Sequence, residues 1–364
     1  MNEVLTTKAL NRATLARQML LGREKAPVLA AIERLAGLQA QQARPPFVGL
    51  WSRVHCFRAE DLGRLARERK VVRATLMRGT LHLVTTRDYL ALRPTFQPML
   101  TAAMHGVLRD RAKGIDVLRL TAAARASLAE RPRTFEELRA VLGQAFPRAD
   151  ARAMGYAVRT HLPLVQVPAD TRWGWPGAAD FAAAEDWIGK PVAAAADARG
   201  LARRYLAAFG PASARDAVTW SGVRELEDAF AALRPKLRVF RDEKGRELLD
   251  LPQAPRPPAE TPAPARFLPD YDNLLLGHAD RTRVISDDHR RRVATKNLQI
   301  LATFLVDGVV AGTWRINRVR ASALLALEPF GEIPRKPRAE LTEEGRALLR
   351  FAEPDAKSFE VRIG

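Results

Sequence analysis

Apolar residues recur with helical spacing along most of the first 235 positions, and short β-rich runs follow the helical segments. Residues 27–36 place four apolar side chains on one helical face, which predicts a helix. Residues 59–69 predict a second helix, with acidic residues in the first turn and basic residues in the last. Residues 71–84 then contain two β-rich runs around Arg78 and Gly79, the pattern of a hairpin. Two helices followed by a hairpin is the order of a winged helix.

The same order occurs twice more along the chain. In the second unit Thr134 starts a helix, with a glutamate three residues later that completes a capping box. A helix over 151–162 and a wing over 163–177, with Pro and Gly at its bends, follow. In the third unit helical segments between 198 and 235 precede a wing over 237–251 with a Lys-Gly turn. We therefore expect one architecture repeated three times, without an exact sequence repeat.

The two ends of the chain differ from these units. The N-terminus predicts an amphipathic helix that opens at Thr6 or Thr7 and closes at Gly22. Residues 252–265 are rich in proline and predict a linker. The chain beyond them is β-rich, with a hairpin turn expected at Asp307-Gly308. The expected fold class is α+β, with three tandem winged-helix units followed by a β-rich C-terminal module. The expected units are residues 1–115 with the N-terminal helix, 116–192, 193–255 and 263–364.

Composition narrows the classes of partner. The chain has 59 Lys and Arg against 41 Asp and Glu, a net charge of +18. This favours nucleic acid or an anionic membrane, although an Arg- and Ala-rich chain is also basic through GC-rich coding. No apolar run approaches the ~20 residues of a membrane helix, and the N-terminus lacks a signal-peptide pattern. We expect a cytoplasmic protein that does not enter a membrane. The single cysteine, Cys56, excludes an internal disulfide and is expected to be a buried apolar residue.

The basic residues cluster on the expected wings and turns. One cluster lies in the third wing, and a second lies within the segment 278–296. Each cluster alone is as well explained by a solvated surface, but several clusters on wings of winged-helix units favour DNA or RNA binding. The basic residues of interest are Arg238, Arg241, Lys244 and Arg246 in the first cluster, and Arg281, Arg283, Arg291 and Lys296 in the second.

The usual catalytic motifs are missing, and the six histidines show no metal-ligand spacing. His82 alternates with apolar neighbours, as a satisfied, half-buried histidine does. The stretch GLQAQQARPP, residues 37–46, is unusual because two neutral amides occupy alternate positions. If Gly37 ends the preceding helix, the chain becomes extended and Gln39 and Gln41 point to the same side. The two amides could then hold one water or one nucleotide edge, or they could bond the backbone of their own loop.

Four segments together resemble the AlkZ and YcaQ family of winged-helix DNA glycosylases. They are ALNRATLARQMLL, GLQAQQARPPFVGLWSRV, LMRGTLHLVTTRDY and YDNLLLGHADRTRV, and the similarity extends over nearly the whole chain. In that family a Gln-x-Gln or Gln-x-Asp motif carries catalysis, and Gln39-Ala40-Gln41 matches the first form. The resemblance implies that Gln39 and Gln41 are the catalytic residues. It also brings His278, Asp280, Arg281 and Arg283 near DNA, and we expect Arg78 and the third wing to contact phosphates.

The implied activity is that of a monofunctional DNA glycosylase. It would hydrolyse the N-glycosidic bond of N7-alkylguanine-type adducts, including interstrand crosslinks, and leave an abasic site. An N7-alkylated guanine is already a good leaving group, so water positioned by neutral amides suffices, with no metal or organic cofactor. The expected partner is double-stranded DNA carrying alkylated purines, bound by a monomer. The alternative is a non-catalytic winged-helix DNA-binding protein, either a regulator or a protein that only binds lesions.

Overall fold

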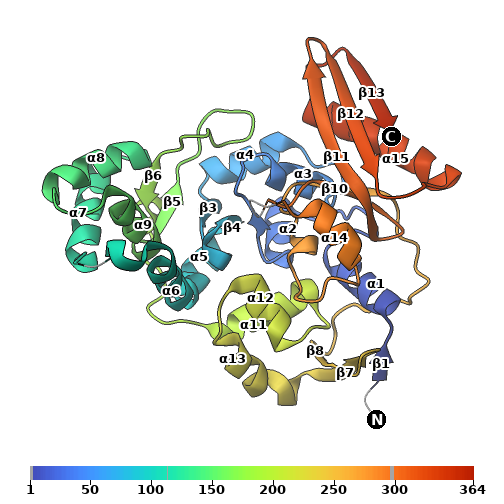
Figure 1. The fold of residues 1–364 in the computed structure, drawn as a ribbon, viewed down its shortest axis with the longest axis horizontal. Helices are drawn as coiled ribbons and strands as arrows, with labels where there is room; N and C mark the ends of the chain where they lie inside the picture. Colours follow the sequence, from blue (N-terminus) through green and yellow to red (C-terminus); the bar gives the residue numbers. More distant parts are fainter. Residues whose placement is uncertain (1–2, 113, 296–298) are drawn as a thin grey trace.

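The structure, a computed structural model, describes residues 3–112, 114–295 and 299–364. Lys296, one of the expected basic residues, lies outside these ranges. The fold is α+β, as expected, and its parts surround a central helical region (Figure 1). Within the described part of the chain, no helix has the length and apolar character needed to cross a membrane.

Residues 7–112 include the helices at the centre of the molecule (Figure 1). These helices begin with α1, which is capped by the Thr6 side chain as expected but ends before the predicted Gly22. The helix ends early because Met19 takes a left-handed conformation, with φ 57°. The elements of this part are α1 Thr7–Arg17, α2 Val28–Arg34, α3 Pro45–Trp51, α4 Ala59–Arg67, the strands β2 Leu38–Gln39, β3 Val71–Thr75 and β4 Leu81–Thr85, the short 3₁₀ turn η1 Met77–Gly79, and α5 Thr86–Leu92 and α6 Gln97–Leu108.

The expected hairpin of the first unit is confirmed, and its sheet continues into the second unit. Strand β3 pairs with β4 and also with β5, Leu164–Gln166, and β5 pairs with β6, Phe181–Ala183. One sheet therefore runs in the order β2-β4-β3-β5-β6. The helices of this second part are α7 Val117–Glu130, α8 Phe135–Ala145, α9 Ala151–His161 and α10 Ala184–Ile188. The capping box at Thr134 is present. The division of the chain into the units 1–115, 116–192, 193–255 and 263–364 stays a prediction.

The second wing differs from the expected 163–177. Its return strand β6, Phe181–Ala183, lies beyond that range. The loop between the strands instead reaches the centre of the molecule. Trp173 packs edge-on against Phe47, with ring centroids 5.2 Å apart. Apolar contact with the first unit therefore draws these residues out of the hairpin.

The third part contains the expected helices and wing. They are α11 Ala198–Phe209, α12 Ala214–Ser221, α13 Leu226–Leu233, β7 Arg238–Asp242 and β8 Glu247–Asp250. The turn at Gly245 has φ 77°, which glycine adopts without strain. The N-terminal strand β1, Glu3–Leu5, pairs in parallel with β7 and completes a three-stranded sheet. Residues 3–5 therefore lie against a strand of the wing 237 residues further along the chain.

The C-terminal module is a five-stranded sheet with a helix packed on it (Figure 1). Its elements are β9 Arg266–Leu268, the 3₁₀ turn η5 Asn273–Leu275, α14 Asp287–Val293, β10 Thr303–Val306, β11 Val309–Val319, β12 Ser322–Pro329, α15 Arg335–Ala352 and β13 Ser358–Ile363. The hairpin turn at Asp307-Gly308 is confirmed. Side chains of the module and of α2, α3 and α4 form one apolar core, which includes Trp51, Phe304 and Leu348. The module is thus packed directly on the first unit.

One expectation about the core is wrong. Cys56 is exposed, not buried. It lies in the turn between α3 and α4 with φ 54°, and its apolar neighbours Val54 and Phe57 occupy the core instead.

Candidate functional site

The Gln-x-Gln stretch follows the path expected beyond a helix end. Gly37 has φ 86°, and a Cβ at this position would meet Val84 Cγ1 at 2.6 Å. A larger residue is therefore excluded by backbone strain and by space. The next two residues form β2, in which Leu38 pairs with Leu83 and Gln39 pairs with His82 of β4. The chain is extended at Gln39, and the expectation of an extended path is confirmed.

Gln39 is held by an arginine from the neighbouring hairpin. Its side chain is buried, and its Oε1 accepts a hydrogen bond from Arg78 Nη2 at 2.6 Å. The other terminal nitrogen of Arg78 donates to the carbonyl of Trp220 in α12. Burial lowers the pKa of Arg78 to about 10, together with the nearby charge of Arg281, and the side chain is still a cation at neutral pH. Arg78 thus ties Gln39 to the third unit.

Gln41 faces the same hairpin but is exposed. Its Oε1 accepts a hydrogen bond from the backbone N–H of Leu81 at 3.3 Å. Both amide oxygens are therefore engaged by residues 78–81, and not by the backbone of their own loop. Among the described residues neither amide nitrogen has a hydrogen-bond partner, so both NH₂ groups are available to donate to water.

The structure adds His82 to this group. It lies opposite Gln39 in the strand register and is fully buried. Its Nδ1 is 3.1 Å from the Thr80 carbonyl, so Nδ1 donates, while Nε2 is buried without a partner in the described part of the chain. Burial lowers the pKa of His82 to about 3, with a further contribution from the charge of Arg78. The ring is neutral at pH 7 and presents an unshared lone pair.

This position of His82 corrects the expectation of a satisfied, half-buried histidine. The ring is completely buried and one of its nitrogens is unsatisfied. An unpaired buried nitrogen is uncommon in proteins and calls for an explanation. The sequence contained one signal, since a histidine within the apolar strand 81–85 has no obvious packing role. The strand register was needed to show that it lies opposite Gln39.

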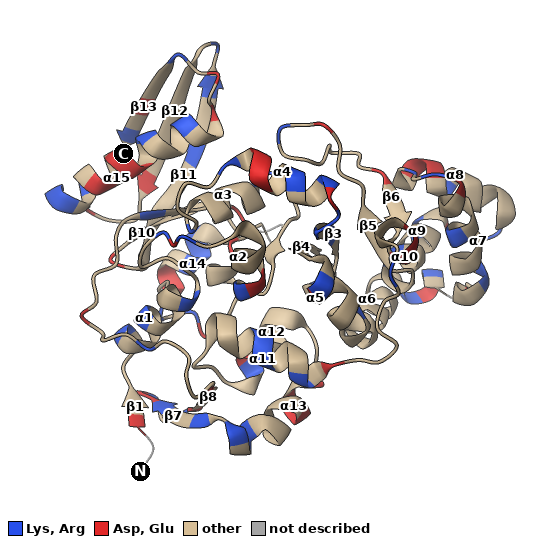
Figure 2. Cartoon of the chain, turned by 180° about the vertical axis from the view of Figure 1, so that it is seen from behind, with Lys and Arg blue, Asp and Glu red and all other residues tan. Residues whose placement is uncertain are grey.

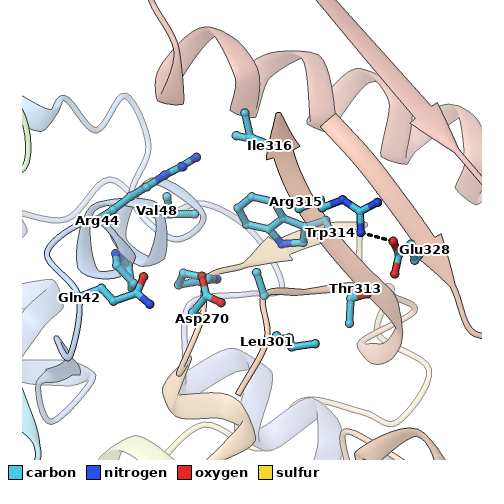
Figure 3. A pocket seen from close by; sticks show the side chains of 13 residues that line it. Gln42, Arg44, Val48, Asp270, Leu301, Thr313, Trp314, Arg315, Ile316 and Glu328 are labelled. Atoms are coloured by element: carbon cyan, nitrogen blue, oxygen red, sulfur yellow. Dashed lines mark hydrogen bonds and ion pairs between the residues drawn. The ribbon is translucent and has the colours of Figure 1, made fainter. Parts of the chain in front are cut away.

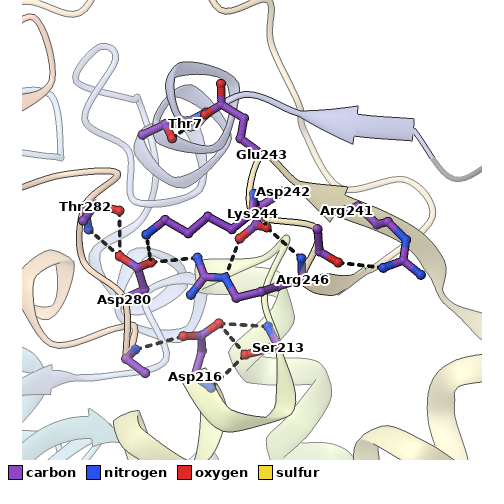
Figure 4. Close-up of polar contacts among 12 residues, drawn as sticks. Thr7, Ser213, Asp216, Arg241, Asp242, Glu243, Lys244, Arg246, Asp280 and Thr282 are labelled. Carbon is purple, nitrogen blue, oxygen red and sulfur yellow. Dashed lines mark hydrogen bonds and ion pairs between the residues drawn. The ribbon is translucent and has the colours of Figure 1, made fainter.

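The third wing and the segment 278–283 come together, although they are far apart in sequence (Figure 4). Asp280 Oδ2 lies 3.0 Å from Lys244 Nζ and 2.7 Å from Arg246 Nη2. Burial alone would raise the pKa of Asp280, but hydrogen bonds from Thr282 and Lys244 and the charge of Arg246 hold it well below its usual range. Asp280 therefore fastens the wing to the C-terminal module.

Other expected basic residues on the surface have partners of their own. Arg241 is exposed and donates to the Gly245 carbonyl at 2.6 Å. Arg238 is exposed and lies 3.3 Å from Glu3. Arg291, on α14, pairs with Asp288, and both side chains are largely exposed. Lys and Arg positions are spread along the whole chain (Figure 2).

Two of the expected site residues are buried. His278 Nε2 lies 3.0 Å from the Phe209 carbonyl, and burial lowers the pKa of this histidine to about 3. Arg283 donates to the Pro211 carbonyl at 3.1 Å and is also buried. Arg281 is partly buried and donates to the His278 carbonyl at 3.2 Å. In this structure these residues connect α11 to the C-terminal module.

Comparison with known proteins places this arrangement in a family. A model of the AlkZ-like DNA glycosylases matches residues 32–351. The chain belongs to the AlkZ-like DNA glycosylase family. The solved structure of the Streptomyces sahachiroi DNA glycosylase AlkZ matches with a TM-score of 0.80 and 21% identity, covering 99% of this chain and 100% of that one. A comparison with curated proteins gives no match.

Membership of the AlkZ-like family confirms the resemblance seen in the four sequence segments. The protein is a DNA glycosylase, an enzyme that hydrolyses N-glycosyl bonds, and its substrate is DNA. The solved AlkZ structure, at its low identity, shows the shared fold. The part of this chain that the family model matches begins within α2. It includes Gln39, Gln41, Arg78 and His82.

Proposed function

We propose that the protein is a monofunctional DNA glycosylase that removes N7-alkylguanine-type adducts and leaves an abasic site. The observation that carries this proposal is the pair of amides beside the hairpin, with Gln39 held by Arg78 at 2.6 Å. A hydrogen bond from a guanidinium to Oε1 fixes which end of the Gln39 amide is nitrogen. The free NH₂ group of Gln39 is then able to donate to the attacking water, and neutral His82 lies opposite Gln39 in the strand register.

These groups suit a reaction whose leaving group needs no acid. An N7-alkylated guanine carries a positive charge, so its glycosidic bond breaks without proton transfer to the base. The enzyme then has to place water next to the sugar carbon as the bond breaks. Gln39 and Gln41 are proposed to orient this water, and its proton passes to bulk solvent through the exposed side of Gln41. Neutral amides stabilise a sugar cation less than a carboxylate does, so unmodified purines are expected to be poor substrates.

The open position of the motif supports action on interstrand crosslinks. Gln41 is exposed, and the motif lies at the end of a short edge strand. A crosslinked base cannot swing out of the duplex into a deep pocket, and it requires a catalytic group that is reachable at the surface. The proposed DNA contacts are those expected from the sequence, at Arg78, the third wing, the segment 278–283 and Arg291. The cytoplasmic location and the monomeric state also stay predictions.

The proposal is tested with a duplex that carries one N7-methylguanine. Wild type, Gln39→Ala and Gln41→Ala are incubated with it, and abasic sites are cleaved with alkali and quantified. Either substitution is expected to slow excision by about a hundredfold, about 3 kcal/mol in the activation barrier, with little change in binding affinity. The control is Gln253→Ala, an exposed glutamine in the proline-rich linker.

Full excision by both variants would contradict the assignment of the glutamines. Tight binding by wild type without excision would indicate a protein that only binds lesions or one that needs a bulkier adduct. A duplex with a single N7–N7 interstrand crosslink separates these two cases, because only the enzyme converts it to single strands.

A further inference from the structure

A cavity of about 330 Å³ borders the catalytic motif, between α3 and the C-terminal sheet. Gln42, the residue after Gln41, lines it together with Arg44, Asp270 and Trp314. Figure 3 shows Gln42 and Asp270 on one side of the cavity, with Arg44 extending above them and the Trp314 ring opposite. The C-terminal module therefore contributes nine of the thirteen lining residues of a site that begins directly after the motif.

Four charged side chains line the cavity; Arg315 and Glu328 form an ion pair, whereas Arg44 and Asp270 are partly buried and lack a full set of partners. Burial raises the pKa of Asp270, although backbone N–H groups, including that of Ala302, and the charge of Arg44 act in the opposite direction. Arg44 Nη2 is buried with no hydrogen-bond partner, and burial lowers the pKa of this arginine. Within the described ranges no ion pair joins the two side chains. Buried polar groups are normally paired, so this cavity suits a ligand that presents both donors and an acceptor.

The apolar surfaces of the cavity favour a flat ligand. Trp314 is fixed because its Nε1 donates to the carbonyls of Leu268 at 2.9 Å and Thr303 at 3.0 Å. Val48 and Ile316 add aliphatic surface. A rigid indole beside aliphatic groups packs well against a planar heteroaromatic ring.

Guanine matches the polar groups as well as the shape. Its Watson–Crick edge presents two adjacent donors, N1–H and N2–H₂, which suit a carboxylate. Its O6 is an acceptor, which suits a guanidinium. Adenine has a donor at N6 and an acceptor at N1, and it cannot bond a carboxylate in this two-pronged way. Asp270 and Arg44 therefore distinguish the two purines.

We propose that this cavity binds the guanine-class base that the enzyme releases, with Asp270 accepting from N1–H and N2–H₂ and Arg44 donating to O6. The proposal rests on the proposed function, since that reaction produces the base beside Gln41. The purine would lie against Trp314, and the alkyl group on N7 would lie on the opposite side of the ring from the edge read by Asp270.

Binding of the free base tests the proposal without requiring catalysis. Full-length wild type is titrated by calorimetry with 7-methylguanine, and adenine serves as the comparison. Wild type is expected to bind 7-methylguanine at least tenfold more tightly than adenine. Asp270→Asn should weaken that binding at least tenfold, because the amide repels one of the two donors. Gln42→Ala, which changes an exposed side chain that lines the cavity, is titrated in the same way as a second variant. The matched control is Asp288→Asn on α14.

Excision by each protein is measured in parallel on the N7-methylguanine duplex. Excision by wild type without measurable binding of 7-methylguanine would overturn this inference and leave the proposed function standing. Equal binding by wild type and Asp270→Asn would also overturn it. Selective binding of 7-methylguanine without excision would support the cavity as a guanine site and count against the proposed reaction.

Discussion

At the scale of single residues, Arg78 has a role that its charge alone does not indicate. It lies in the hairpin turn with φ 54°, and its guanidinium is directed inward to Gln39 and to the Trp220 carbonyl. The two acceptors lie at fixed positions that match the two terminal nitrogens of a planar guanidinium. The single ammonium group of a lysine cannot reproduce this geometry. The contact with phosphate expected from the sequence stays a prediction, and it competes with this inward arrangement.

Replacing Arg78 by lysine separates the two roles. If Arg78 orients Gln39, Arg78→Lys should reduce the single-turnover rate of excision by about tenfold, ~1.4 kcal/mol, with unchanged DNA affinity. If Arg78 contacts a phosphate, a lysine should preserve most of the rate. In that case Arg78→Ala would weaken binding and lower the slope of log affinity against log salt by about 0.9. Excision kinetics and binding at several salt concentrations give both quantities.

At the scale of elements, the third wing is held at its first strand and at its turn. Strand β7 pairs with β1 from the N-terminus, and the turn is fastened by Asp280 of the C-terminal module. Asp280 also accepts hydrogen bonds from Thr282, so its carboxylate organises both the wing and its own loop. A wing fixed in this way keeps Arg241 and Lys244 at a constant position relative to the motif, which favours a role in positioning DNA.

Asp280→Asn should release the wing. The amide loses two ion pairs, and we expect the free energy of unfolding to fall by about 1–3 kcal/mol. Trypsin should cut after Lys244 or Arg246 several times faster than in wild type, because both side chains lose a partner. Mass spectrometry of the fragments locates the cuts. The control Asp288→Asn removes an exposed pair worth almost nothing, and equal cutting in both variants would argue against the tether.

At the scale of the whole molecule, buried polar groups connect parts that are distant in sequence. Arg53 pairs with Asp272 at 2.7 Å, and Arg17 pairs with Asp250 at 2.7 Å, with all four side chains almost completely buried. His278 and His82 are buried as well, each in a different part. Charging any of these histidines requires opening the structure, so the stability of the whole depends on pH.

Stability is expected to fall in mild acid. The pKa of His82 and of His278 is about 3 in the folded protein, against about 6.5 in an unfolded chain. Between these values the unfolded state binds more protons, so the free energy of unfolding decreases as pH falls. From pH 7 to pH 5 the loss should be about 4 kcal/mol for the two groups. Urea unfolding at both pH values measures it.

Substitutions assign this pH dependence to the histidines. His278→Asn should remove about half of the difference between pH 7 and pH 5. His55→Asn, which replaces an exposed histidine, should leave the difference as in wild type. A free energy of unfolding that is the same at pH 7 and pH 5 in wild type would contradict the prediction.

The sequence by itself determined the local elements and the family. Helical spacing, the capping box at Thr134 and the turns at Gly79, Gly245 and Asp307 depend on neighbouring residues, and each is present in the structure. The extended path at Gln39 was also predictable, because Gly37 ends the preceding helix.

Only the tertiary structure decided which distant residues meet. Arg78 faces Gln39, His82 lies opposite it, Asp280 holds the wing, and Asp270 closes a cavity beside Gln42. These contacts join segments 34 to more than 200 residues apart. They depend on strand register and on the shared apolar core. The sequence alone does not show which of the many guanidinium groups is directed into the protein. The packing of the first unit, the third wing and the C-terminal module against one another therefore also determines which polar groups come together in the site.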